Sequence, residues 1–341
     1  AKSGVSLLFG QKQTYDFSLR YHVSNPSQNP GIVEVALPPD TPWQQVWYNG
    51  LNPVAESIRV DQDGNWIAQY RLAGQASQDI VTTGQVVLFA APKVPVPQTS
   101  PLLEQDQVWW SGNEASPWLK AQSYWPTDKP VVRQAAEQNT SAQSIYDFVV
   151  ETLQYNSARA RQSTSVARLG AVGALQDPSN ALCQEYTDVF IALARTAGIP
   201  ARRVTGYAVN QSSVLRPLSL VSDVLHAWPE YYDVQRGQWV AVDPTWGDTT
   251  GGVDYFHRFD LRHIVFARQG VSDSLPLAAG QYKIGGEEAA DVVVRIATTS
   301  AVPQQATLQM TLEPVQNLSW IGQPRRVKIV VENSSGLARY N

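Results

Sequence analysis

The sequence predicts an α+β fold in which a central segment of helices and antiparallel strands lies between two β-rich stretches. Short runs of β-branched and aromatic residues, separated by turn residues, extend to about residue 96 and return after residue 286. Between them, apolar residues recur at helical spacing. A chain of 341 residues also exceeds one ordinary domain. We therefore predict three domains, at residues 1–96, 97–285 and 286–341.

The two outer segments have the pattern of antiparallel β-sandwich-type domains. In the N-terminal segment, Tyr-Asp-Phe-Ser-Leu-Arg-Tyr-His-Val at residues 15–23 alternates apolar and polar positions, and Asn-Gly and Asp-Gly pairs supply turns. A Pro-rich stretch at 91–101 predicts a stiff linker. The C-terminal segment fits only three or four strands, whereas an immunoglobulin-type sandwich needs about seven. We expect either a truncated immunoglobulin-like domain or a small appended sheet there.

The central segment predicts helices first and strands afterwards. Residues 141–155 place apolar side chains on one helical face. A second helix is predicted from Leu182 to Ala197, with Ser179 or Asn180 as its cap and Gly198 at its end. Three strand-like runs follow it and favour an antiparallel sheet.

Composition excludes several classes of function. The formal net charge is −4 and the isoelectric point is near 5.6, which disfavours a nucleic-acid surface. One cysteine, Cys183, excludes an internal disulfide bond, and four scattered histidines make a structural zinc site improbable. We expect no metal and no organic cofactor.

Several features favour a protein that acts outside the cytoplasm. The chain begins with Ala1 and has no apolar run of about 18–20 residues that would span a bilayer. A single cysteine suits an oxidising compartment, although it is also compatible with a cytosolic protein. We expect a secreted, periplasmic or cell-surface location, with a signal sequence not present in this chain and no transmembrane segment.

Cys183 lies at the start of the second predicted helix. The free N–H groups and the dipole of a helix N-terminus favour a thiolate, and they can also stabilise an oxyanion formed by its attack on a carbonyl. The alternative is a buried, inert thiol, which is the common state of a lone cysteine.

His226 and Asp243 lie on two strands that we expect to form a hairpin centred near Arg236. In that register Asp243 is one diagonal step from the position opposite His226, so a bulge or shifted turn brings the side chains together. Taken singly, His226 can be a core histidine and Asp243 a turn former. Together with Cys183 they provide the nucleophile, the base and the orienting carboxylate of thiol acyl transfer.

Three blocks of sequence resemble the transglutaminase-like superfamily, in family order and spacing. They are the stretch from Cys183-Gln-Glu-Tyr to Val204-Thr-Gly-Tyr, His226-Ala-Trp-Pro-Glu, and Trp239-Val-Ala-Val-Asp-Pro-Thr-Trp-Gly. The resemblance covers roughly residues 130–275 and is closer to bacterial and archaeal surface proteins than to animal tissue transglutaminases. It implies a papain-like α+β core, with Cys183 as nucleophile, His226 as general base and Asp243 as orienting carboxylate.

The sequence departs from the family at Ala181, where the family often has glycine. Alanine tolerates a positive φ poorly, so the local turn is expected to differ. Some family members stabilise the oxyanion with an upstream aromatic or amide side chain. For the upstream candidates here, packing is the favoured role; they are Trp109, Trp110, Trp118, Trp125 and Gln176.

Three further features lie near these blocks. The arginines Arg159, Arg161 and Arg168 are expected to form a solvated face rather than a substrate contact. His257 and His263 lie six residues apart without supporting ligands for a metal. The Gly-rich loop after Trp246 is either one wall of a cleft or a tight connection.

These observations favour an enzyme that carries out acyl transfer or hydrolysis at protein or peptide amides through a thioester, as a transglutaminase-like acyltransferase or a cysteine protease or amidase. Its partner would be a protein or peptide substrate, such as a cell-wall or surface protein. Two alternatives stay open: a surface-binding or scaffold protein whose centre is idle, and a cell-wall peptidase.

Overall fold

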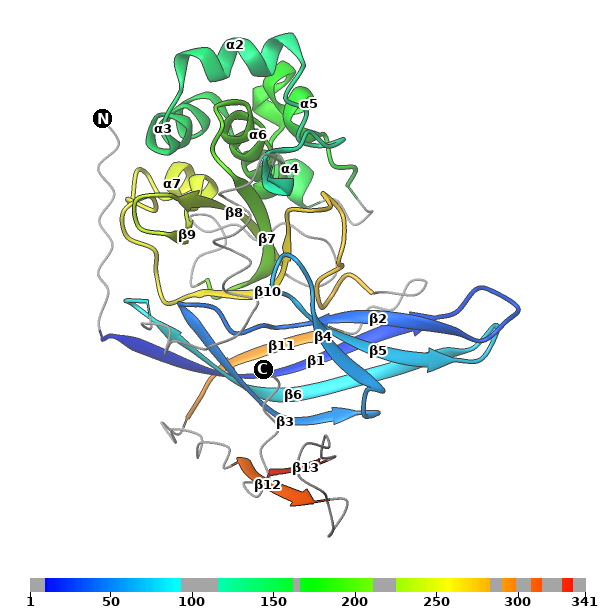
Figure 1. Ribbon diagram of the computed structural model, residues 1–341. Helices are drawn as coiled ribbons and strands as arrows, with labels where there is room; N and C mark the ends of the chain where they lie inside the picture. The colour runs from blue at the N-terminus through cyan, green and yellow to red at the C-terminus, as the bar shows by residue number, and fades with distance from the viewer. Residues whose placement is uncertain are drawn as a thin grey trace, which may run out of the picture.

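The computed structural model describes residues 10–92, 116–161, 166–210, 225–282, 290–298, 308–314 and 327–333. The predicted α+β class is confirmed: a layer of helices covers a four-stranded antiparallel sheet, and further β-sheets lie on its other side (Figure 1). Among the described helices, we find none with the length and apolar character that a membrane span requires. The predicted boundaries at residues 96 and 285 fall outside the described residues, as does most of the predicted linker, and the three-domain division stays a prediction.

The N-terminal segment forms two antiparallel sheets around one apolar core. Alternation in β1 buries the five apolar side chains of residues 15–23, as the sequence predicts. The strands are β1 (Lys12–Ser24), β2 (Gly31–Leu37), β3 (Gln44–Asn52), β4 (Ser57–Val60), β5 (Trp66–Leu72) and β6 (Ser77–Phe89). One sheet has the order β11-β1-β6-β3, in which β11 (Val292–Ile296) comes from the C-terminal segment, and the other has the order β2-β5-β4.

The C-terminal segment contributes strands to two different sheets. Strand β11 (Val292–Ile296) pairs with β1 and so extends the N-terminal sheet. Strands β12 (Leu308–Pro314) and β13 (Val327–Asn333) form a two-stranded antiparallel sheet of their own. Part of this segment therefore completes a sheet that begins almost 300 residues earlier in the chain.

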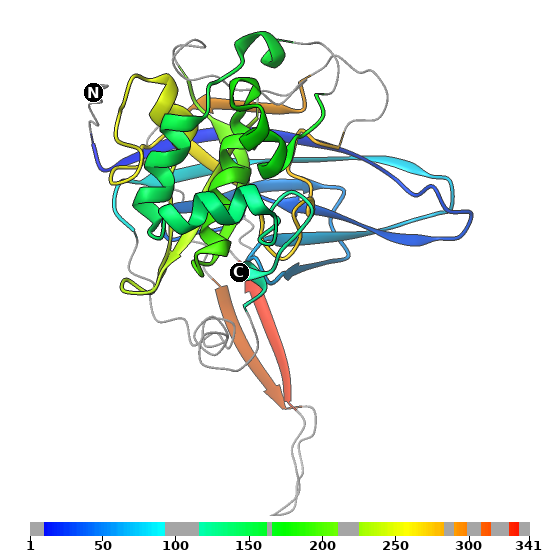
Figure 2. The same ribbon diagram turned by 90° about the horizontal axis from the view of Figure 1, so that it is seen from above.

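The helical layer is built around α6 (Cys183–Thr196), whose residues from Cys183 to Arg195 are all buried. Helices α2, α3, α5 and α7 and strands β7 and β8 contact it, and Figure 2 shows the helices lying over the sheets. The other helices are η1 (Pro117–Leu119), α2 (Pro130–Gln138), α3 (Ala142–Thr152), α4 (Ser157–Ala160), α5 (Gly170–Gln176), η2 (Pro178–Asn180) and α7 (Pro244–Thr249).

The central sheet has the order β10-β7-β8-β9. Its strands are β7 (Ala201–Ala208), β8 (His226–Asp233), β9 (Gln238–Ala241) and β10 (His263–Gln269). Strand β9 ends at Ala241, and Pro244 then starts helix α7, because proline lacks the N–H that a ladder requires but suits the first position of a helix.

Two side-chain amides from the N-terminal sheets cover the free edge of β10. Gln44 accepts a hydrogen bond from the N–H of Val265 at 2.8 Å and donates to its carbonyl at 3.0 Å. Asn65 does the same for Arg268, at 2.7 and 2.8 Å. An exposed strand edge leaves N–H and C=O groups without partners, and these amides bond to such groups as a neighbouring strand would. They fix the N-terminal sheets against the central sheet.

We predict that Asn65→Ala lowers the free energy of unfolding by about 2–4 kcal/mol, because it leaves a buried N–H and C=O of Arg268 without partners. Urea unfolding followed by tryptophan fluorescence measures the change. Gln85→Ala is the matched control, since it removes only an exposed amide bond to Asp16. Equal unfolding midpoints for the two variants would contradict this account of the interface.

Candidate active site

The candidate nucleophile lies at the first residue of α6, as the sequence predicts. The predicted cap is wrong: Ser179 and Asn180 belong to η2, and the cap position is Leu182. The Leu182 N–H donates instead to Oε2 of Glu185 at 2.9 Å. An acidic residue in the first turn thus accepts from the N–H of the N-cap residue, which is one half of a capping box and helps to fix where the helix begins.

Two buried ion pairs hold the first turns of α6. The guanidinium of Arg159 donates to Glu185 at 3.1 Å, and that of Arg168 donates to Asp188, which also accepts from the indole N–H of Trp125 at 2.8 Å. The expectation of a solvated arginine face is therefore wrong for Arg159 and Arg168. Their charges neutralise carboxylates that burial would otherwise destabilise strongly.

Ala181 adopts an extended conformation, with φ −89° and ψ 145°. The chain here forms a parallel bridge to Tyr155 and needs no positive φ. The departure from the family's glycine is therefore compatible with an ordinary alanine backbone. Cys183 still follows at the start of the helix.

His226 and Asp243 meet, as predicted from the hairpin. Nε2 of His226 lies 3.0 Å from Oδ2 of Asp243, and both side chains have an exposed fraction of 0%. The observed register pairs Glu230 with Ala241, so Asp243 lies beyond the last ladder pair. It reaches His226 as the N-cap of α7, where Oδ1 accepts from the Trp246 N–H at 3.1 Å. The carboxylate is thus both cap and partner.

Burial and charge shift the pKa values of His226 and Asp243 in opposite directions. Burial lowers the pKa of His226, but the charge of Asp243 and the hydrogen bond to it outweigh burial and raise the pKa to about 10. Burial likewise raises the pKa of Asp243, yet the charge of His226 and the bonds from His226 and His263 hold it well below its ordinary value. At neutral pH the pair is therefore imidazolium and carboxylate.

Cys183 acts on the other side of the His226 ring. Its hydrogen bond and its charge both raise the pKa of His226. Nδ1 of His226 makes no regular hydrogen bond to a nitrogen or oxygen within the described residues, so it is the ring atom available to exchange a proton with the thiol. Buried Arg203 on β7 adds a positive charge: burial lowers its pKa to about 10, and negative charges including that of Cys183 oppose this.

The structure adds two residues that the sequence analysis did not assign to the site. Nε2 of His263 lies 3.2 Å from Oδ2 of Asp243, and Nδ1 of the same ring lies 2.7 Å from Oδ1 of Asp260. One carboxylate oxygen of Asp243 thus faces two imidazoles. The sequence signal was weak, consisting of Asp260 and His263 three residues apart at the start of a strand.

His226, Asp243 and His263 are also close enough to share a cation, since their ligand atoms lie within 4.8 Å of one another. Their arrangement is nevertheless that of hydrogen bonds, because both Nε2 atoms point at one oxygen at 3.0 and 3.2 Å. The second nitrogen of His263 is held by Asp260. We therefore do not assign these residues as metal ligands.

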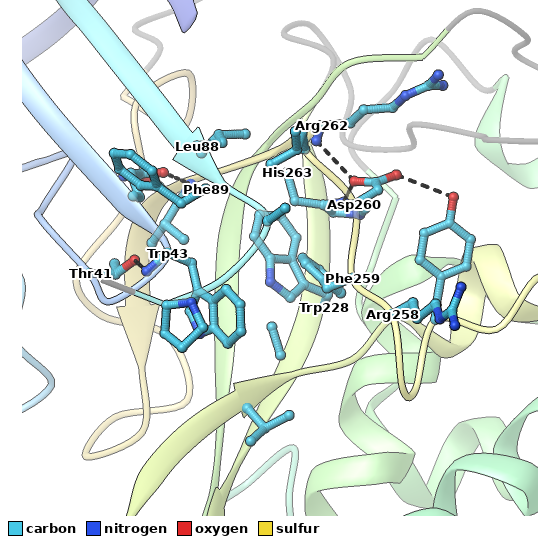
Figure 3. A pocket seen from close by; sticks show the side chains of 18 of the residues that line it. Thr41, Trp43, Leu88, Phe89, Trp228, Arg258, Phe259, Asp260, Arg262 and His263 are labelled. Carbon is cyan, nitrogen blue, oxygen red and sulfur yellow. Dashed lines mark hydrogen bonds and ion pairs between the residues drawn. The ribbon is translucent and has the colours of Figure 1, made fainter. Parts of the chain in front are cut away.

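A cavity of about 1220 Å³ adjoins the His263 end of this group. Figure 3 shows Trp43, Leu88 and Phe89 of the N-terminal sheets facing Trp228, Phe259 and His263 across it. The Gly-rich loop contributes residues 253–256 to the lining, so it forms a wall of this cavity. Cys183 is fully buried and does not line it.

Two of the upstream candidates are buried, as a packing role predicts: Trp118 also donates to Asp63 at 2.6 Å and Trp125 to Asp188. Gln176 is exposed, so the predicted packing role is wrong for it. Trp109 and Trp110 lie outside the described residues.

Part of the chain is similar to known proteins. Residues 127–244 match the sequence profile of the transglutaminase-like superfamily. A 73-residue stretch is 37% identical to a protein-glutamine gamma-glutamyltransferase of Pseudomonas aeruginosa, over 21% of this chain and 11% of that protein. The chain therefore spans only about a ninth of that relative's length.

Solved structures with low sequence identity also resemble the chain. A proposed cysteine protease from Cytophaga hutchinsonii is 16% identical with a TM-score of 0.46, over 84% of this chain and 86% of that one. The periplasmic domain of TgpA from Pseudomonas aeruginosa, bound to ethylmercury, is 15% identical with a TM-score of 0.34, over 70% and 91%.

The fold and the matched segment define the class of protein: an α+β domain with a cysteine at a helix start and a histidine on the neighbouring sheet. Within this chain, residues 127–244 carry the sequence profile of the transglutaminase-like superfamily.

We predict that Asp243→Asn lowers the pKa of His226 by at least about two units, because removing the carboxylate charge leaves burial as the dominant effect. An NMR titration of ¹⁵N-labelled histidine measures it. Asp79→Asn is the matched control, because Asp79 accepts from His22 at 2.7 Å on the N-terminal sheet. A His226 titration unchanged by Asp243→Asn would contradict the assigned electrostatics.

Proposed function

We propose that the chain is a thiol-dependent acyl-transfer enzyme that acts on protein or peptide amides, with Cys183 as nucleophile, His226 as acid and base, and Asp243 as the orienting carboxylate. The observation that carries the proposal is the position of His226. Its Nε2 is bonded to a buried carboxylate, and a cysteine at the start of a helix raises its pKa through a hydrogen bond and its charge.

The first half of the reaction would form a thioester. The Cys183 thiolate attacks the carbonyl carbon, and the N–H groups at the start of α6 stabilise the oxyanion. When the C–N bond breaks, the imidazolium of His226 gives its Nδ1 proton to the leaving nitrogen, which departs as ammonia or an amine. Asp243 keeps the ring oriented and favours its charged form.

The second half would release the acyl group. An amine or a water attacks the thioester carbonyl, His226 takes its proton, and the Cys183 sulfur leaves as thiolate. An amine yields a new amide, and water yields a carboxylic acid. The chain would thus act as a transglutaminase-like acyltransferase or as a cysteine protease or amidase, depending on which nucleophile reaches the thioester.

We further propose that the enzyme acts outside the cytoplasm, in the secreted, periplasmic or cell-surface environment. The support is compositional: a single cysteine among 341 residues avoids unwanted disulfide exchange in an oxidising compartment. A cell-wall or surface protein is the substrate class that this location favours.

Burial of the nucleophile favours one other candidate function. Cys183 has an exposed fraction of 0%, as expected of an idle centre in a surface-binding or scaffold protein. An idle thiol would be alkylated slowly by iodoacetamide, with little dependence on pH near neutrality. In the enzyme, alkylation should follow the thiolate population and slow markedly in Asp243→Asn. A flat, slow profile shared by both proteins would favour the scaffold.

We predict that Cys183→Ala abolishes turnover and that Asp243→Asn lowers kcat by up to about 10⁴-fold while the fold is kept. The assay supplies a glutamine-containing peptide and a biotinylated primary amine, and mass spectrometry separates conjugate, free acid and cleaved peptide. Asp79→Asn controls for loss of a histidine–carboxylate pair elsewhere. Near wild-type rates in either site variant would refute the assignment.

The proposed role of His226 as an acid sets the direction in which kcat changes with pH. Because the leaving nitrogen needs the proton of the imidazolium, kcat should fall as pH rises past the raised pKa of His226, about 10. Asp243→Asn lowers that pKa, so its alkaline limb should lie at lower pH. An alkaline limb at the same pH in both proteins would contradict the role of His226 as acid.

A further inference from the structure

His263 is a buried imidazole placed between two carboxylates. Its Nε2 lies 3.2 Å from Oδ2 of Asp243 and its Nδ1 lies 2.7 Å from Oδ1 of Asp260. Its side chain has an exposed fraction of 0%. The reaction proposed above uses neither His263 nor Asp260, so this pair of contacts needs its own explanation.

The geometry determines the protonation state of His263. An ionised carboxylate only accepts hydrogen bonds, so each ring nitrogen that faces one must carry a hydrogen. With Asp243 on one side and Asp260 on the other, both nitrogens donate and the ring is an imidazolium. Consistently, burial lowers the pKa of His263, but the charge of Asp260 and the bonds to both carboxylates outweigh burial and raise it.

Asp260 is itself firmly held. Its Oδ1 accepts from the Arg262 N–H at 2.9 Å, and its Oδ2 accepts from the hydroxyl of Tyr255 at 3.3 Å. Burial raises the pKa of Asp260, but the charge of His263, its hydrogen bond, and the N–H and charge of Arg262 outweigh burial and keep the pKa below its ordinary value. Asp260 is therefore a fixed negative charge that keeps His263 protonated.

The surroundings of His263 include few other titratable groups. From β8, the ring of His226 lies 5.6 Å away, and from the Gly-rich loop, that of Tyr255 lies 6.2 Å away. The remaining neighbours are aromatic: Trp246 at 4.5 Å, Phe259 at 4.4 Å and Trp228 at 5.0 Å between ring centroids. Such packing fixes the ring plane and lowers the local dielectric, which strengthens each charge.

We propose that His263, held by Asp260, is a positioning residue of the candidate centre: as an imidazolium it keeps the Asp243 carboxylate ionised and turned toward His226. The proposal rests on the proposed function and deepens it. Asp243 is held on Oδ1 by the Trp246 N–H and on Oδ2 by His263, so its orientation survives each proton transfer at His226. The positive charge on His263 also opposes the charging of His226, which limits how basic that ring becomes.

The chain contains a matched control for this arrangement. His22, on β1, also lies between two carboxylates, with Nδ1 2.7 Å from Asp79 and Nε2 3.1 Å from Asp291. Its side chain is mostly buried, with an exposed fraction of 10%. It has the same bonding pattern on the N-terminal sheet, remote in sequence from Cys183, His226 and Asp243. Replacing it tests the cost of losing such a histidine outside the candidate centre.

The test compares His263→Phe, His263→Gln and His22→Gln. His263→Phe removes the charge and the donor, and should lower kcat about 10–100-fold with little change in KM, as loss of an orienting partner does. His263→Gln keeps an N–H for Asp243 without the charge, so it should recover most of kcat. In His263→Gln, which keeps Asp243 in place but removes the positive charge, the NMR-measured pKa of His226 should rise above the wild-type value. His22→Gln should change neither quantity.

Two results would overturn the proposal. One is a His226 pKa that is unchanged in His263→Gln, since that would show no charge on His263. The other is His263→Phe with wild-type kcat, or His263→Gln impaired as severely as His263→Phe. Thermal unfolding of each variant identifies any that fails to fold, and His263→Gln, which keeps size and polarity, then decides the matter.

The proposed acyl transfer and the proposed role of His263 can each be refuted without refuting the other. The NMR titration of His226 needs no turnover, so it tests the proposed charge on His263 even if the chain proves inactive toward amides. Conversely, suppose that the chain is an active enzyme and that its His226 pKa does not change in His263→Gln. That result would refute the role of His263 and leave the proposed acyl transfer in place.

Discussion

The site depends on the hydrogen bonds and ion pairs that the Asp243 carboxylate makes. One oxygen caps α7 through the Trp246 N–H, and the other faces the Nε2 atoms of His226 and His263. A buried negative charge of this kind is tolerable only when positive charge and N–H donors surround it. The same contacts that make Asp243 stable therefore also fix the ring of His226.

The position of Cys183 depends in turn on the helix that carries it. Helix α6 is buried along almost its whole length, so its start is fixed by packing and by two buried ion pairs, Arg159 with Glu185 and Arg168 with Asp188. The edge of the central sheet is fixed independently by Gln44 and Asn65. The candidate nucleophile and the candidate base thus come from separately anchored elements, an arrangement that would preorganise a reaction site.

Much of this was predictable from sequence because it depends on local pattern. Alternation in residues 15–23, helical spacing after Cys183 and the hairpin that brings His226 to Asp243 are short-range signals. Most of the misses have long-range causes: Arg159 and Arg168 pair with carboxylates on α6, and His263 reaches Asp243 across 20 residues. Such partners are chosen by tertiary packing, which one sequence without relatives does not display.

The central claim is that the sulfur of Cys183 forms a covalent acyl bond during turnover. Because the chain has a single cysteine, mass spectrometry after an acid quench locates that bond without ambiguity. With a glutamine-containing peptide and no amine acceptor, the account predicts that the peptide, less ammonia, is attached to the fragment containing Cys183. Product formation with no adduct on Cys183 at any time, together with undiminished turnover in Cys183→Ala, would contradict it.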